Sequence, residues 1–151
     1  MLFFVRVLIV AACLALPSLA MAQAKHFAAS QRHFEDLANK AADLSASMDN
    51  PGEKNLCNYY TATAMLYALR AHALAQLAAV EERLRQPEDL ALVRAKIVET
   101  KNVAARHLTN DLKALESLAA SSENSRIHDL GMRLVNEVRV FSHNADTAAR
   151  Q

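Results

Sequence analysis

Residues that interrupt helices are scarce in this chain. Its 151 residues include two glycines and three prolines, and beyond residue 22 the only prolines are Pro51 and Pro87. The intervening segments are rich in alanine, leucine, glutamate, glutamine, arginine and lysine, all of which favour helices. We find no run of alternating polar and apolar residues bounded by turn residues, so no strand is predicted. The pattern therefore predicts an all-α protein built from a few long helices.

The first 22 residues have the three-part layout of a secretory signal peptide. Arg6 precedes an apolar run over 7–16, and the small-residue pattern Ala20-Met21-Ala22 follows Pro17. The uninterrupted apolar stretch after Arg6 is about 16 residues, short of the roughly 20 that a membrane-spanning helix needs. We therefore expect cleavage near Ala22, a periplasmic or secreted bacterial protein, and no stable membrane anchor.

A lipoprotein signal is the alternative reading of the same segment. The sequence Val10-Ala11-Ala12-Cys13 is similar to a lipobox, in which the cysteine becomes the acylated first residue. The apolar run continues past Cys13 to Leu19, where a lipoprotein would normally turn polar. This favours ordinary cleavage, and whether Cys13 is lipidated stays open.

Residues 23–151 are predicted to form one domain of four helices. Apolar side chains recur at the 3.6-residue period over about 25–48, 51–85, 87–120 and 126–149. Asn50 is placed to cap the second helix, and Pro51 and Pro87 fit the first helical positions of the second and third. Short connections between helices of similar length predict an antiparallel up-down-up-down four-helix bundle.

The second predicted helix, 51–85, is unusually apolar. From Leu56 to Val80 its only formally charged side chain is Arg70. A helix that is apolar around most of its circumference needs more than one packing partner. It either lies deepest in the bundle or presents a face to a protein partner or to a second copy in a homodimer.

Charge and motif analysis excludes several classes of function. Removal of Arg6 with the signal leaves 16 basic and 16 acidic side chains and no basic patch, so nucleic acid is not an expected partner. No Glu-x-x-His pattern is present, and no two histidines stand three or four residues apart, so no metal site is predicted. A Gly-x-Ser-x-Gly nucleophile motif is also absent. We expect neither an enzyme nor a cofactor.

Secreted b-type cytochromes of about this size are four-helix bundles with one Met and one His haem ligand on the terminal helices, so Met48 and His143 are the residues to compare with that pattern. The chain lacks Cys-x-x-Cys-His, which covalent haem attachment needs. For non-covalent haem, His143 points away from the apolar stripe of its helix, and Met48 lies near the opposite end of the bundle. Haem binding is not predicted.

Cys57 is the one cysteine left after processing. An odd thiol in an oxidising compartment cannot form an internal disulfide. Two readings stay open: a small buried hydrophobic residue, which we favour, or an intermolecular disulfide.

Arg70 and Lys101 form the only candidate ligand site. Counting from the predicted turn near Gln86 places both on inward faces at one level of an antiparallel hairpin. An unpaired buried charge is strongly unfavourable, so the two cations must pair with carboxylates, extend to the surface, or hold an anion. The last reading predicts an anionic ligand in the interior, with a hydroxyl added by Tyr67 or Thr63.

The leading functional prediction is a non-catalytic exported protein that acts through protein–protein interaction. An inhibitor, an immunity factor, a chaperone and an envelope subunit would all fit. The alternative is a bundle that holds a small anionic molecule in its interior.

Overall fold

The computed structural model describes residues 2–148, with side chains from Ala22 onward. It contains four helices, α1 (Leu2–Ala46), α2 (Pro51–Arg83), α3 (Pro87–Ala120) and α4 (Ser125–Ala148), and no strand over those residues. The predicted all-α, four-helix fold is confirmed. Three of the predicted helix ranges differ from the observed ones by two residues or fewer, with residue 149 outside the described part.

The first helix differs from its predicted range because α1 begins at Leu2 rather than near residue 25. The backbone of the segment predicted as a signal peptide is thus continuous with the first helix of the bundle. Its cleavage stays a prediction. Cys13 and its possible lipidation lie outside the residues whose side chains are described.

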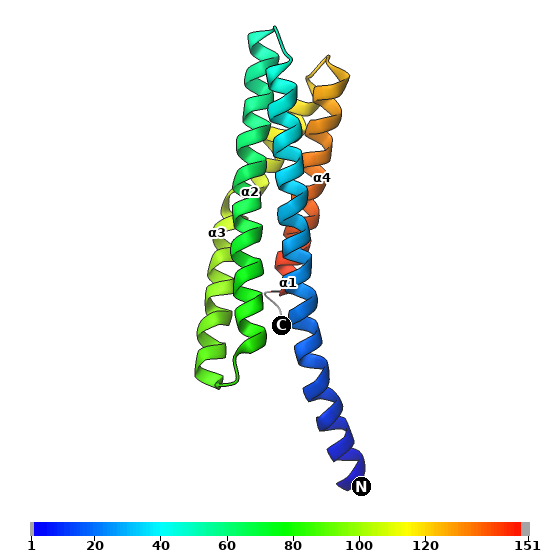
Figure 1. The fold of residues 1–151 in the computed structure, drawn as a ribbon, viewed down its shortest axis with the longest axis vertical. Coiled ribbons are helices and arrows are strands. Elements are labelled where there is room, and N and C mark those ends of the chain that lie inside the picture. Colours follow the sequence, from blue (N-terminus) through cyan, green and yellow to red (C-terminus); the bar gives the residue numbers. More distant parts are fainter. Residues whose placement is uncertain (1, 149–151) are drawn as a thin grey trace.

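Each helix runs antiparallel to the one before it, and the four form an elongated bundle (Figure 1). The backbone of α2 approaches those of all three other helices, whereas α1 and α3 do not approach each other within the described residues. Helices α2 and α4 therefore lie on the short diagonal of the bundle. Figure 1 also shows that the α2–α3 turn extends beyond the end of the shorter helix α4.

The turn between α1 and α2 is closed by the predicted cap. The Asn50 side-chain oxygen accepts hydrogen bonds from the backbone N–H groups of Gly52, at 2.8 Å, and Glu53, at 3.3 Å. Pro51 occupies the first turn, where its missing N–H leaves no intrahelical bond unmade. These contacts let α2 begin five residues after α1 ends.

An aromatic cluster joins α1, α2 and α4 at the centre of the bundle. The Phe34 ring lies 5.5 Å from the Tyr67 ring, and the Phe141 ring lies 5.9 Å from Phe34 and 5.8 Å from Tyr67. Phe27 extends the cluster with its ring 6.2 Å from that of Phe141. All four residues are almost completely buried. Edge-to-face pairs of this kind add to the stabilisation from burial alone.

Gly131 lies where α4 packs closely against Tyr60 on α2 and Ala119 on α3. A Cβ atom at this residue would lie 2.6 Å from the Tyr60 hydroxyl oxygen and 2.8 Å from the Ala119 Cβ atom. Only a glycine leaves room for the Tyr60 ring between these helices.

Candidate protein-interaction surface

Helix α2 carries two rows at the same spacing, an inner one that is apolar throughout and an outer one that is apolar except for Gln76. The inner stripe comprises residues spaced alternately three and four apart, each no more than 1% exposed: Cys57, Tyr60, Ala64, Tyr67, Ala71, Leu74 and Ala78. The outer stripe follows it by two residues at each position: Tyr59, Ala62, Leu66, Leu69, Ala73, Gln76 and Val80. Two residues turn an α-helix by about 200°, so the outer stripe lies on the side of α2 opposite the core.

The large side chains of the outer stripe are open to solvent. Leu69 is 64% exposed, Leu66 and Val80 are each 44% exposed, and Tyr59 is 37% exposed. Met65, beside Leu66, is also exposed. From Tyr59 to Val80 the stripe is roughly 32 Å long at 1.5 Å per residue. No charged residue lies on it, which sets it apart from the usual polar outer face of a bundle helix.

Helix α3 adds further exposed apolar side chains. Leu92, Val98 and Val103 are all exposed on its first half. Within 87–103 the only buried residue is Ile97. The α2–α3 hairpin therefore presents exposed apolar side chains on both of its helices. Contiguous apolar surface is a general feature of protein-interaction sites, which makes this hairpin the candidate surface.

Arg70, the one charged residue between Leu56 and Val80, turns away from the outer stripe. Its guanidinium lies 4.8 Å from the centre of the Tyr67 ring, and a terminal nitrogen lies 3.7 Å from a carboxylate oxygen of Asp111 on α3. The Tyr67 hydroxyl donates a 2.9 Å hydrogen bond to that carboxylate. Burial, and then the bond to Asp111, raise the pKa of Tyr67 above its usual value.

Lys101 pairs with a different carboxylate. Its ammonium lies 2.8 Å from an oxygen of Asp146 on α4, and both side chains are more exposed than Arg70. Thr63 is buried on α2. The structure thus brings Arg70 and Tyr67 together and places a carboxylate beside each cation. The Arg70 nitrogen nearest Asp111 is buried and makes no hydrogen bond among the described residues. The anion-binding role of these residues stays a prediction.

Neither Asp111 nor Asp146 was predicted from the sequence as the partner of an inward cation. Asp111 lies beside the apolar stripe of α3, on the side facing α2, and this position was the signal that could have identified it as the partner of Arg70. Asp146 lies near the end of α4. Its contact with Lys101 depends on how α3 and α4 are aligned along the bundle axis, which the sequence does not show.

Cys57 belongs to the inner stripe and is fully buried as a free thiol. Burial, reinforced by the nearby Glu53 charge, raises the pKa of this thiol. An intermolecular disulfide would require this buried sulfur to become exposed.

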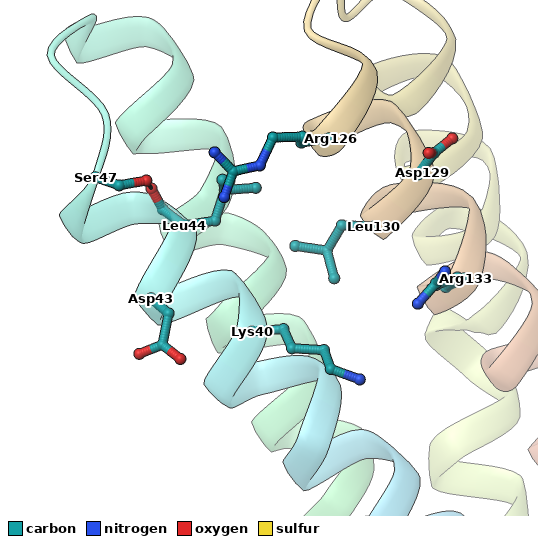
Figure 2. A pocket seen from close by; sticks show the side chains of 8 residues that line it. All are labelled: Lys40, Asp43, Leu44, Ser47, Arg126, Asp129, Leu130 and Arg133. Carbon is teal, nitrogen blue, oxygen red and sulfur yellow. Dashed lines mark hydrogen bonds between the residues drawn. The ribbon is translucent and has the colours of Figure 1, made fainter.

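A groove of about 420 Å³ lies between the end of α1 and the start of α4 (Figure 2). Leu44 and Leu130 form its apolar part, and its charged lining residues are Lys40, Asp43, Arg126, Asp129 and Arg133. The charged side chains are exposed and of both signs, and Figure 2 shows Lys40 and Arg126 extending into the space between the two helices, whereas Asp43 points away from it. The groove lacks the buried, fixed polar groups that typically orient a small ligand.

The described residues hold no cluster of three or more histidine, cysteine, aspartate or glutamate side chains placed to bind a metal ion. The pair considered for haem is separated, since Met48 contacts Asn124 at the α4 start whereas His143 is exposed near the α4 end. Among the helices as described, none is both long and apolar enough to cross a membrane.

No protein family, curated protein or solved structure matches the chain significantly.

Proposed function

We propose that this is a non-catalytic, exported helical protein that acts by binding a protein partner, either a different protein or a second copy of this chain, through the outer stripe of α2. The observation that supports the proposal is the row of exposed apolar side chains on the stripe, which has no charged member. Covering apolar surface contributes about 25 cal/mol for each Å² removed from water. A partner that covered Leu66, Leu69 and Val80 would gain this energy without disturbing the core.

Export rests on the N-terminal sequence. The core residues described on α1 lie between Phe27 and Leu44. Cleavage after Ala22 would therefore leave them all in place and give a mature protein beginning at Gln23. In a periplasmic or secreted setting, a binding protein of this kind would serve as an inhibitor, an immunity factor, a chaperone or an envelope subunit.

The alternative of an interior anion site has no comparable support. Asp111 and Asp146 already lie beside the two cations that would hold the anion.

The export step is tested by sequencing the N-terminus of the protein recovered from the periplasm or the medium. We expect Gln23 as the first residue. Protein recovered only from the cytosol with residues 1–22 intact would contradict it.

The interaction is tested by placing a photo-crosslinking amino acid at position 69 in the cells of origin. The matched control carries the same amino acid at position 39, where Asn39 is exposed on α1 among charged neighbours. We expect adducts of discrete mass from position 69 and none from position 39. The interaction is refuted if position 69 gives no discrete adduct, or if both positions give the same ones.

A further inference from the structure

We propose that the partner of the outer stripe is a second copy of this chain, with the two α2 helices packed antiparallel. This inference rests on the proposed function, because it assumes that the outer stripe is a binding surface.

The spacing of the outer stripe is that of a coiled-coil seam. Alternate steps of three and four residues keep the side chains in line with a partner helix along its whole length. One further step of three from Val80 reaches Arg83, which is exposed at the end of α2. The seam therefore extends from Tyr59 to Arg83.

A parallel pair would place identical residues opposite each other. Ala62 would face Ala62 and Ala73 would face Ala73, which would leave gaps at two layers of the interface. The bulky Tyr59 would face the Tyr59 of the second copy. At the end of the seam, Arg83 would meet the Arg83 of the second copy, and like charges at such a position repel. The order of small and large side chains along the seam therefore disfavours parallel pairing.

An antiparallel pair centred between Leu69 and Ala73 complements itself. In that register Leu69 faces Ala73 of the other copy, Ala62 faces Val80, and Leu66 faces Gln76. Each alanine then meets a larger side chain, which is the arrangement that fills a helix interface without gaps. The two-fold axis repeats every contact, as a symmetric dimer requires.

The ends of the antiparallel seam also match. Tyr59 of one chain faces Arg83 of the other, and a guanidinium over an aromatic ring is an attractive pair. The single charge that interferes with parallel pairing therefore contributes to antiparallel pairing. This self-complementarity favours a second copy over an unrelated protein as the occupant.

The size of the surface sets the expected strength of the dimer. A seam about 36 Å long and about 10 Å wide covers roughly half of the approximately 800 Å² per partner that a standard interface buries. Flanking residues must supply the remainder, and Leu92 and Val103 on α3 are exposed apolar candidates. We therefore expect a dimer that dissociates on dilution.

The first test is sedimentation of the processed full chain over a concentration series. Leu69→Glu introduces a carboxylate into the centre of the seam in each copy, and Val140→Glu is the matched control at an exposed valine of α4. We expect the unchanged chain and the Val140→Glu variant to dimerise, and the Leu69→Glu variant to stay monomeric with unchanged helical content. A wild-type monomer at every concentration, or equal behaviour of the two variants, overturns the proposal.

The second test reads the direction of pairing from disulfide formation. Tyr59→Cys and Arg83→Cys variants are oxidised separately and then as a mixture, with the buried Cys57 retained. We expect a covalent dimer mainly from the mixture. Efficient crosslinking of Arg83→Cys with itself overturns the antiparallel register.

The two proposals fail in different ways. A monomeric protein whose position 69 captures a discrete adduct with another protein refutes self-association and leaves the proposed function standing. A monomeric protein with no adduct at position 69 refutes both.

Discussion

The two stripes of α2 share spacing, helix and apolar character, yet one is completely buried and the other is open to solvent. Leu74 on the inner stripe is 1% exposed, whereas Leu69 on the outer stripe is 64% exposed. The difference comes from the other three helices, which all pack on one side of α2. An apolar row at helical spacing thus shows that a helix has a face to bury, but not that its own chain buries it.

The inner stripe has features that suit it to a core. Its small side chains let neighbouring helix backbones approach α2 closely, and they belong to Ala64, Ala71 and Ala78. Tyr67 fills the centre and still has a hydrogen-bond acceptor, because Asp111 reaches its hydroxyl. The outer stripe instead presents Leu66 and Leu69 side by side, where they suit a partner surface.

The largest predicted contrast between the stripes comes from truncating one leucine on each. Leu74→Ala removes a buried side chain and leaves a cavity, so we expect a loss of about 2–5 kcal/mol in the free energy of unfolding. Leu69→Ala leaves no cavity, and we expect a change within about 0.5 kcal/mol. Urea unfolding of dilute, monomeric protein measures both values. Similar losses in the two variants would show that Leu69 is buried within the monomer.

A second prediction concerns how closely the inner stripe packs against α4 at Gly131. Gly131→Ala gains about 1 kcal/mol of helix propensity, but its Cβ atom would overlap Tyr60 and Ala119, and overpacking costs about 1–3 kcal/mol. We expect a net destabilisation of up to about 2 kcal/mol.

The Tyr60→Phe substitution tests the cause of that destabilisation. It removes the hydroxyl oxygen nearest to the added Cβ atom, and this oxygen is buried without a hydrogen-bond partner among the described residues. The double variant should regain part of the lost stability in a thermodynamic cycle, and only part, because Ala119 and the ring carbon Cζ of residue 60 still lie too close to the added Cβ atom. Strict additivity of the two changes would place the strain elsewhere.

The sequence predicted the helices well because helix signals are local. Asn50 and Pro51 mark the start of α2, and the period of apolar residues marks the helix faces. The Gly131 contact could also be anticipated, since a glycine within a helix needs a packing reason. Arg70 was recognised as inward-facing, but its partner was not, because pairing with Asp111 depends on how two helices are aligned.

The outer stripe illustrates a different limit. The sequence indicated that α2 needs more than one packing partner, and left open whether those partners come from this chain. In the structure α2 is central, with contacts to all three other helices, and it still exposes Leu66 and Leu69. Periodicity could not resolve this, because both stripes of α2 have the same period.

The third prediction compares the two inward cations. Asp111→Asn leaves Arg70 beside a neutral amide at a site where its side chain is only 15% exposed, so we expect a loss of about 1–2 kcal/mol. Asp146→Asn affects a pair open to solvent, and we expect about 0–1 kcal/mol. Thermal unfolding of the two variants measures the difference. A larger loss in Asp146→Asn would reverse our assignment of Arg70 as the more buried cation.

The smallest predicted effect appears only at alkaline pH and tests whether the inner tyrosines stay buried. Burial raises the pKa of Tyr60 from 10.0 to about 12, and that of Tyr67 is raised further. Above pH 10 the unfolded chain releases these phenolic protons while the folded chain retains them, so the unfolded state binds fewer protons and stability falls as pH rises.

The Tyr60→Phe variant lacks one of these groups and should lose less stability above pH 10 than the unchanged chain. Tyr59→Phe, on the outer stripe, is the positional control. The urea midpoint of each protein below and above pH 10 gives the comparison. The expected pH dependence comes from the burial of Tyr60. If the unchanged chain and the Tyr60→Phe variant lose the same stability above pH 10, water must reach this part of the inner stripe. The two faces of α2 would then differ only in how far they are exposed, because neither would be fully buried.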